Sequence, residues 1–436
     1  MRRMLVSLAC CASLSLAGCG SNIDPESLEP LDKIDFRPNS EFGFDALMLG
    51  LRLGKQEIDA RMPEDGVARA EGYRYLLRLV EMNLGTLTAD QDAARPQLSR
   101  CPTRNCRLGF DNPDYTYVGV NPLSKDYNYR LYGDRGTAAY FWFQVLERST
   151  GAFGGTSKTR SQDMVFAPDG SWEIFLGAEK PDGVPDSNFL ELKEEQATMV
   201  IRIAHRDWDS TIEPSITVEN LGAVEAPIEP FKPMRMAITG FGLSKMIPNQ
   251  VKRWIGIIEG APLNDVARPC RGWANGCSNT GGFGNFSAGG KYAVAEDEAL
   301  IIEAPWLPAG YTNIQLGNIW GESLDYANKQ TSLNDFQAHL NGDNVYRYVL
   351  SHRDPGVPNW LDISDHPEGG IFMRWVEPEE GRDPPKPNGK VVKLAALREH
   401  LPADTPKISS AERAEVLKRR LMAYNRRMSP ANISAP

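Results

Sequence analysis

The side chains that could do acid–base or metal chemistry near neutral pH are few, because the sequence contains only five histidines. Two of them lie near one loop: His352 stands two residues before Asp354, and His366 follows the Asn359-Trp360 motif by six residues. Two imidazoles and a carboxylate around one loop could hold a metal ion or supply a general base. The spacing matches neither HExxH nor another clustered motif, so we predict no metal and no cofactor. Surface histidines that cap strands are the alternative.

The loop between these two histidines occurs twice in the chain. Residues 354–363 read DPGVPNWLDI, and residues 181–192 read PDGVPDSNFLEL. The segments before the loops also align, 169–177 with 342–351 as a turn followed by a strand. Further upstream we align YTYVGVNPLSKDYNYRLYG with ALIIEAPWLPAGYTNIQLGNIWG as strand, proline turn and strand. Matches in the same order indicate an internal repeat.

One asparagine and one arginine recur at equal places in the two copies. Arg202 follows Asn188 by 14 residues, and Arg374 follows Asn359 by 15. An asparagine can bond its own turn, and a mid-strand arginine needs partners because burying an unpaired charge is costly. These residues could therefore brace each loop against a strand. The alternative is a ligand-binding site in the second copy, which alone has histidines around its loop, formed by Asn359, Trp360, Arg374, His352 and Asp354.

The segments that position these residues alternate between helical and β patterns. From Tyr115 onward, short runs rich in aromatic and β-branched residues are separated by Gly, Pro, Asn and Asp, which predicts antiparallel sandwiches. We expect a mainly β fold with accessory helices: two jelly-roll-like antiparallel β-sandwich modules, an N-terminal helical hairpin packed on the first module, a helical linker and a C-terminal helix. The linker pattern at 231–259 contains Gly240, Gly242 and Pro248, which should break it.

The C-terminal helix should begin at Ser409, because Ser409 and Glu412 form a capping box. Its apolar residues are spaced for one face, and we expect the basic ones on the others, namely Arg413, Lys418, Arg419 and Arg420. Such a basic helix is either solvated or contacts acidic headgroups or a partner.

The first residues predict export and lipidation. An apolar run after Arg2 and Arg3 ends in LAGC, so cleavage should leave Cys19 as the lipidated first residue. A plain secretory peptide is the alternative. The predicted boundaries are 1–18 for the lipoprotein signal peptide, 19–42 for a polar tether, 43–225 for the hairpin and first module, 226–290 for the linker and a Gly-rich loop, 291–380 for the second module, and 381–436 for a Pro-rich segment and the last helix.

The charge of the chain excludes some partners. The sequence has 48 basic and 57 acidic residues; cleavage removes Arg2 and Arg3, so the mature charge is 46 minus 57, or −11. Nucleic acid binding requires basic stripes, which are not present. The lipid on Cys19 should therefore hold the protein at a membrane. Gly20 rather than aspartate follows Cys19, so in a host with two membranes we expect the outer one, with the body in the periplasm.

The remaining cysteines indicate an oxidising compartment. Cys10 and Cys11 lie in the signal peptide, and the four others form the short pairs CPTRNC and CRGWANGC. Such pairs in an exported chain predict disulfides. The bridges would join Cys101 to Cys106 and Cys270 to Cys277. A zinc site is the alternative, although the spacing misses the usual two to four residues.

A DG turn before a strand, an N-W-L loop and an arginine about fifteen residues later resemble the β domain of bacterial envelope proteins classified as domain of unknown function 1214. The resemblance covers 112–208 and 298–375 and implies two tandem copies of a jelly-roll-like module. Asp362 stands where relatives often have proline, and Phe189 replaces tryptophan in the first copy. The resemblance implies no reaction.

We therefore expect an envelope lipoprotein that binds an apolar or carbohydrate-like ligand or a protein partner. Nine tryptophans and fourteen tyrosines could supply an aromatic surface. The alternatives are a hydrolytic or metal-assisted enzyme centred on the second module and a structural assembly subunit. An enzyme predicts polar groups converging in one pocket, and an assembly subunit predicts a broad apolar patch.

Overall fold

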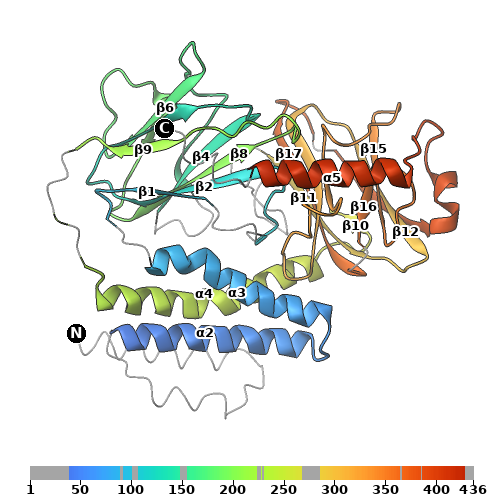
Figure 1. Ribbon diagram of the computed structural model, residues 1–436, viewed down its shortest axis with the longest axis horizontal. Helices are drawn as coiled ribbons and strands as arrows, with labels where there is room; N and C mark the ends of the chain where they lie inside the picture. The colour runs from blue at the N-terminus through green and yellow to red at the C-terminus, as the bar shows by residue number, and fades with distance from the viewer. Residues whose placement is uncertain are drawn as a thin grey trace.

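The computed structural model describes residues 39–88, 92–100, 107–147, 155–222, 227, 230–267, 285–363, 366–383 and 385–427. Two β modules lie side by side, a layer of helices lies along one edge of the molecule, and the C-terminal helix runs along the second module and reaches the first with one end (Figure 1). Cys19 and the cysteine pairs Cys101–Cys106 and Cys270–Cys277 lie outside the described residues. Lipidation and both disulfides therefore stay predictions.

The first module is a sandwich of two sheets. One sheet has the order β1-β2-β8-β4-β5 and the other β7-β6-β3-β9. Only β6 and β7 pair in parallel. The strands are β1 (Gln97–Arg100), β2 (Tyr115–Leu123), β3 (Tyr129–Asp134), β4 (Tyr140–Glu147), β5 (Gly155–Arg160), β6 (Ser171–Gly177), β7 (Phe189–Glu191), β8 (Ala197–Ala204) and β9 (Thr217–Asn220).

The second module repeats this topology strand for strand. Its sheets have the orders β10-β11-β17-β13-β14 and β16-β15-β12-β18, so each strand corresponds to the one nine places earlier. The strands are β10 (Asp265–Val266), β11 (Phe286–Ala293), β12 (Glu298–Pro305), β13 (Ala309–Gly317), β14 (Ser332–Asn334), β15 (Val345–Ser351), β16 (Trp360–Asp362), β17 (Glu368–Pro378) and β18 (Asn388–Lys393). They extend beyond the predicted 291–380, because β10 and β18 are short edge strands without a clear pattern.

The topology corrects one part of the sequence alignment. We aligned 115–133, which holds β2 and β3, with 299–321, which holds β12 and β13. The strand order instead equates β3 with β12, so this part was shifted by one strand. Strand–turn–strand patterns look alike in sequence, and periodicity alone does not distinguish successive hairpins. The later alignment of 169–177 with 342–351 agrees with the topology, since these segments contain β6 and β15.

The helical layer consists of α2 (Ser40–Arg61), α3 (Val67–Thr88) and α4 (Pro233–Glu259). The predicted break of α4 is wrong: it is continuous through Gly240 and contains Pro248. A Cβ at Gly240 would lie 1.8 Å from the Gly43 carbonyl oxygen, so glycine allows α2 and α4 to approach closely. Close packing between helices outweighs the poor helix propensity of glycine. Among the described helices, none is long and apolar enough to cross a membrane.

We predicted that the helical hairpin packs on the first module. In the structure it contacts the second module instead. Trp320, which follows β13, donates from Nε1 to the carbonyl of Ala68 at 2.7 Å. Arg74 of α3 lies 2.7 Å from Glu322, and Arg78 contacts the same carboxylate. The hairpin prediction could not identify its partner because both modules present similar sheets.

The C-terminal helix α5 (Ser410–Arg427) begins at the predicted capping box. The Ser409 amide donates to Glu412 at 2.8 Å, and the Glu412 amide donates to Ser409 Oγ at 3.3 Å. The prediction that its basic residues face outward is confirmed for Lys418 and Arg419, which are exposed, and is wrong for Arg413 and Arg420. Three arginines at intervals of seven residues are buried against the body, Arg413, Arg420 and Arg427.

These three arginines, which we call the arginine ladder, connect the two modules. Arg413 donates to Oε1 of Gln330 in the second module at 2.7 Å. Arg427 donates to the carbonyl of Pro113 in the first module at 2.9 Å. Arg420, the middle arginine of the three, is buried, and this burial lowers its pKa to about 10. The helix therefore connects the modules: it runs along the second module and its C-terminal end meets the first (Figure 1).

Candidate functional site

The structure does not bring the predicted histidines and Asp354 to one place. The His352 imidazole lies 2.9 Å from the carbonyl of Val294, and His366 lies 3.0 Å from Glu71 of α3. Asp354 pairs with Arg413 of α5 at 2.9 Å. No group of three or more histidines, cysteines or carboxylates in the described part of the chain is placed to hold a metal ion.

Arg374 and Trp360 do not frame one pocket, so that prediction is wrong. Arg374 is on β17, and its side chain lies on the sheet face turned toward the first module, where it donates to the carbonyl of Phe110. Trp360 is on β16 in the other sheet and packs with Val392 and Leu397 on the opposite side of the sandwich. The core of the second module separates the two side chains.

The two repeated asparagines make the same bonds. Asn188 accepts from the amide of Val165 at 2.8 Å and donates to its carbonyl at 2.9 Å. Asn359 accepts from the amide of His339 at 2.7 Å and donates to its carbonyl at 2.7 Å. Each side chain thus pairs with a backbone segment as a β-strand would, which is the bracing role considered from the sequence.

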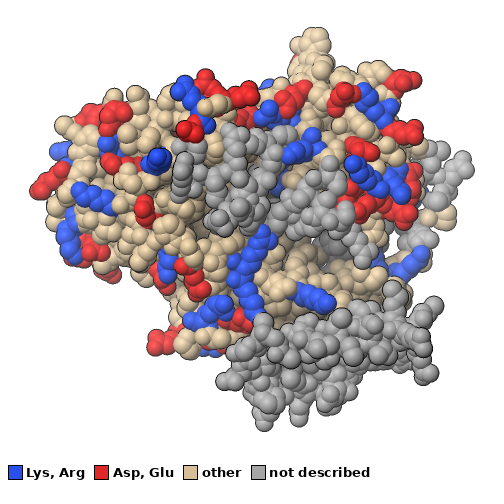
Figure 2. Space-filling view, turned by 180° about the vertical axis from the view of Figure 1, so that it is seen from behind, with Lys and Arg blue, Asp and Glu red and all other residues tan. Residues whose placement is uncertain are grey.

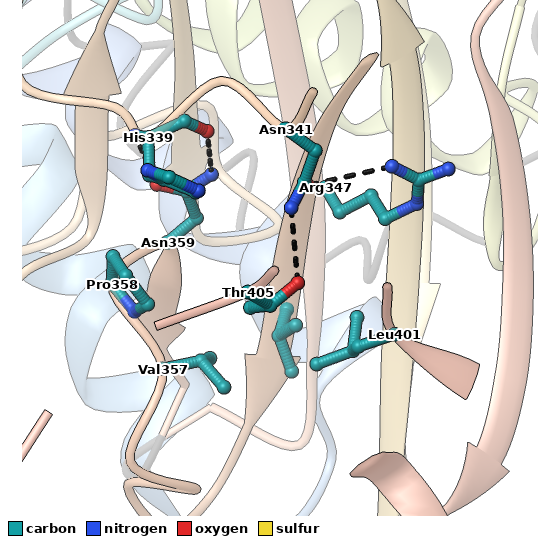
Figure 3. Close-up of a pocket in the computed structure, with 9 residues that line it drawn as sticks. His339, Asn341, Arg347, Val357, Pro358, Asn359, Leu401 and Thr405 are labelled. Carbon is teal, nitrogen blue, oxygen red and sulfur yellow. Dashed lines mark hydrogen bonds between the residues drawn. The ribbon is translucent and has the colours of Figure 1, made fainter. Parts of the chain in front are cut away.

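Asn359 also lines a small pocket in the second module (Figure 3). Its polar wall contains His339, Asn341 and Thr405, and the last two are joined by a bond of 3.0 Å. The empty space is about 210 Å³, part of it open to solvent. Ligand pockets usually enclose roughly 300 to 1,000 Å³, so this one is too small for a drug-sized ligand. A ligand role for Asn359 stays a prediction.

A buried cluster in the first module has the residue types of a catalytic triad but not its geometry. Thr116 Oγ1 and Glu213 Oε1 lie 3.2 and 3.1 Å from the same nitrogen, Nε2 of His205. A proton relay needs the acid and the nucleophile on opposite ring nitrogens. The His205 side chain is buried, and burial lowers its pKa. This cluster stabilises the first module rather than performing catalysis.

The junction between the modules holds a larger polar and aromatic network. Tyr115 and Tyr140 on the outer face of the first module pack with Tyr311 of the second, with ring centroids 5.9 Å apart for the pairs that include Tyr115. Asp114 accepts bonds of 2.8 Å from Trp208 of the first module and from Asn334 of the second. One carboxylate therefore fastens both modules.

Each module places its arginine on this junction face at the same register. Arg202 of β8 stands opposite Trp142 of β4, and Arg374 of β17 stands opposite Asn313 of β13. Each donates to a glutamine two residues further along the neighbouring strand, Gln144 or Gln315. The two side chains are equivalent parts of the repeated module, and sequence reasoning paired them correctly.

The surroundings of the two arginines differ. Arg374 is buried, bonded to Gln315 and to the Phe110 carbonyl, and lies 4.2 Å from the Phe372 ring centroid. Arg202 is only partly buried. It bonds Gln144 at 2.8 Å and lies 5.0 Å from the Trp142 ring centroid, and no carboxylate of the described residues pairs with it.

Burial lowers the pKa of the Arg202 guanidinium from its usual value, and Tyr117 and Tyr115 offset this in part. An arginine remains charged in proteins, so Arg202 carries a positive charge that has lost much of its water without gaining an acid. In the same cross-strand row, Arg160 of β5 stands beyond Trp142 and pairs with Asp163 at 2.6 Å. We call Tyr117, Arg202, Trp142 and Arg160 the arginine row.

Sequence reasoning missed the tyrosine cluster and Asp114. One signal was available: β4 reads YFWFQVLE, a nearly continuous apolar run without alternation. A strand with one wet face alternates, whereas a strand covered on both faces does not. The run therefore indicated that something packs on the outer face of this sheet, although not what.

Asp111, which lies between β1 and β2, is buried at the junction and titrates in an unusual range. Burial raises its pKa to about 6, although Ser323, Tyr326 and nearby arginines oppose this. Tyr326 donates to one carboxylate oxygen at 2.9 Å, and among the described residues the other oxygen has no hydrogen-bond partner. The folded protein therefore retains a proton that the unfolded chain releases at lower pH.

Asp111→Asn should stabilise the protein by an amount that grows above about pH 4 and is complete above about pH 6. A raised carboxyl pKa contributes stability that is complete below the unfolded value of about 4 and is lost as the pH rises through the folded value of about 6. Asparagine removes this loss, so we expect a gain of about 2 to 3 kcal/mol at pH 8 and little change at pH 4. Urea unfolding at both pH values measures it. Exposed Asp182→Asn is the control, and a gain that is equal at both pH values would contradict the assignment.

The comparisons with known proteins give a family and solved structures whose descriptions state no activity. Residues 119–206 match the family described as "Protein of unknown function (DUF1214)". The first module thus resembles this family, as its residues indicated, whereas the match does not include the second module. No curated protein matches the chain.

Two solved structures resemble the chain over most of its length. An uncharacterised protein from Burkholderia cenocepacia is 27% identical with a TM-score of 0.72, and the match covers 82% of this chain and 98% of that one. The VPA0106 protein from Vibrio parahaemolyticus is 12% identical with a TM-score of 0.43, covering 80% and 100%.

Proposed function

We propose that the protein is a lipid-anchored envelope protein that binds an acidic, carbohydrate-like ligand at the arginine row of its first module. The observation that carries the proposal is Arg202, whose guanidinium has its pKa lowered by burial and has no carboxylate partner among the described residues. A carboxylate or phosphate group would supply the missing charge through two parallel hydrogen bonds.

The repeated module provides an internal comparison for this site. In the second module, Arg374 donates a hydrogen bond to the Phe110 carbonyl, which takes the position that an acidic partner would occupy. In the first module, Arg202 as a whole residue is less buried than Arg374, and it lies beside Tyr117. Duplicated modules repeat their skeleton, and a difference in how the same residue is covered points to the copy that retained a site. We therefore propose a site in the first module, whereas the sequence had favoured the second.

Arg202→Gln should weaken binding of small acidic sugars without loss of stability. Hydrogen bonds to a charged group contribute about 1.5 to 3 kcal/mol, so affinity should fall roughly ten- to a hundredfold. The probes are glucuronate, glucose 6-phosphate and glucose, titrated calorimetrically or by NMR. Glucuronate and glucose 6-phosphate separate a carboxylate site from a phosphate site, and glucose tests whether the sugar alone suffices.

Arg130→Gln is the matched control, because Arg130 belongs to the same module but already pairs with Glu173 at 2.9 Å. Its loss should leave the affinity unchanged. The melting temperature of Arg202→Gln should equal or exceed that of the natural protein, since a poorly solvated charge is removed. Equal binding by both variants, or no binding of either acid to the natural protein, would overturn the proposal.

A further inference from the structure

The start of α4 presents an apolar stripe to solvent. Phe231, Met234 and Ile238 are 43%, 48% and 62% exposed. Phe241 continues the stripe at helical spacing, and Phe42 from the first turn of α2 stacks on it with ring centroids 6.1 Å apart. We call these five residues the helix-start patch. Apolar side chains that gather at one place on a surface mark a contact with another surface.

Basic residues flank this patch. Lys245 lies 4.6 Å from the Phe241 ring centroid, and Arg235 lies 5.2 Å from that of Phe231. The sequence of α4 contains four basic residues and one acidic residue. Glu41 and Asp45 of α2 are the nearby acidic residues in the sequence of the first two turns. An apolar stripe with basic flanks fits the boundary between acyl chains and anionic headgroups, although the whole chain is acidic.

The patch lies at the end of the helical layer where the described chain begins. Helices α2 and α4 run parallel, because Gly43 packs against Met236 and Gly54 packs against Ile247. Both helices therefore start at the same end. Only 20 residues, 20–39, separate Cys19 from the first residue of α2. A lipid on Cys19 would hold this end near the bilayer.

We infer that the helix-start patch enters the headgroup region of an anionic bilayer, so that the helical layer faces the membrane and the β modules point away from it. The inference rests on the proposed lipid anchor for the choice of a membrane as partner. The contact itself requires no lipid modification, because a surface helix binds through its own apolar face and charges. The anchor and the patch together would fix the orientation of the protein relative to the bilayer, which an anchor alone does not fix.

The test uses residues 20–436, which keep every described residue and cannot be lipidated. Sedimentation with vesicles of phosphatidylglycerol and phosphatidylethanolamine measures the bound fraction. Introducing Met234→Asp with Ile238→Asp should weaken the partitioning by more than about tenfold, because two carboxylates must then enter the interface. Ile212→Asp is the matched control, since Ile212 is 65% exposed in the first module and its replacement should change nothing.

Thermal unfolding of each variant checks that the fold is kept. Vesicles of phosphatidylcholine should bind the natural sequence more weakly, since the basic flank then has no anionic partner. The inference is overturned if residues 20–436 stay in the supernatant, if the double variant still sediments, or if the patch mediates self-association in sedimentation velocity without lipid. Fractionation of Cys19→Ala in its host tests the anchor separately, so failure of one does not imply failure of the other.

Discussion

Replacing Arg413 by alanine is expected to lower the free energy of unfolding by about 3 kcal/mol. Its guanidinium bonds Asp354, Gln330 and the carbonyl of Val357, and it lies over the Trp360 ring. Removal leaves the buried Gln330 oxygen and the Val357 carbonyl without their donor and removes the cation from Asp354. Urea unfolding monitored by tryptophan fluorescence measures the change.

Arg419→Ala is the control for this prediction. Arg419 carries the same charge on the same helix but is exposed, so its loss should cost less than about 0.5 kcal/mol. Arg413→Lys should recover only part of the loss, because a single ammonium does not reproduce the planar fork of donors. Similar losses for the Arg413 and Arg419 variants would show that helix charge, and not the buried contacts of the arginine ladder, stabilises the C-terminal helix.

Two glycines of α4, two positions apart, should respond to alanine with opposite signs. At Gly240 the added Cβ would lie 1.8 Å from the carbonyl oxygen of Gly43 and 2.8 Å from its Cα. Backbone atoms cannot rotate away as a side chain can, so α2 must shift and lose packing. We expect Gly240→Ala to cost about 2 to 3 kcal/mol.

At Gly242 the added Cβ meets no atom within 4 Å. Alanine there gains helix propensity, so Gly242→Ala should stabilise by about 0.5 to 1 kcal/mol. Thermal and urea unfolding of both variants compare the two directly. Stabilisation by both would show that α2 and α4 are not in close contact, and destabilisation by both would show that the start of α4 does not tolerate any side chain on its exposed face.

Much of the module architecture could be predicted from the sequence because it depends on local patterns. Runs such as 197–204 alternate buried and partly buried residues, and the capping box at Ser409 is a local signal. The recurrence of Asn188 and Asn359 identified the equivalent loops, since the same side chain makes the same backbone bonds in both. These features need only neighbours within a module.

The candidate site could not be predicted because it depends on contacts between segments far apart in the chain. Arg202 and Arg374 have the same register, yet only Arg374 donates a hydrogen bond to the carbonyl of Phe110, which lies 264 residues away in the sequence. The break predicted at Gly240 failed for a similar reason: glycine reads as a helix breaker unless the opposing Gly43 is known. Likewise, the sequence shows the spacing of Arg413 and Arg420, but it does not show the buried oxygens that accept their hydrogen bonds.

The place of α5 at the end of the described chain also has a consequence for synthesis of the protein. Its 18 residues emerge after both modules, yet they cover Trp208 of the first module and Trp360 of the second. A chain interrupted before residue 410 lacks this helix and so leaves these two rings and Asp354 without its cover. Such a product would display apolar rings that proteases and chaperones bind. Attachment of this last helix therefore distinguishes a finished molecule from a shortened one.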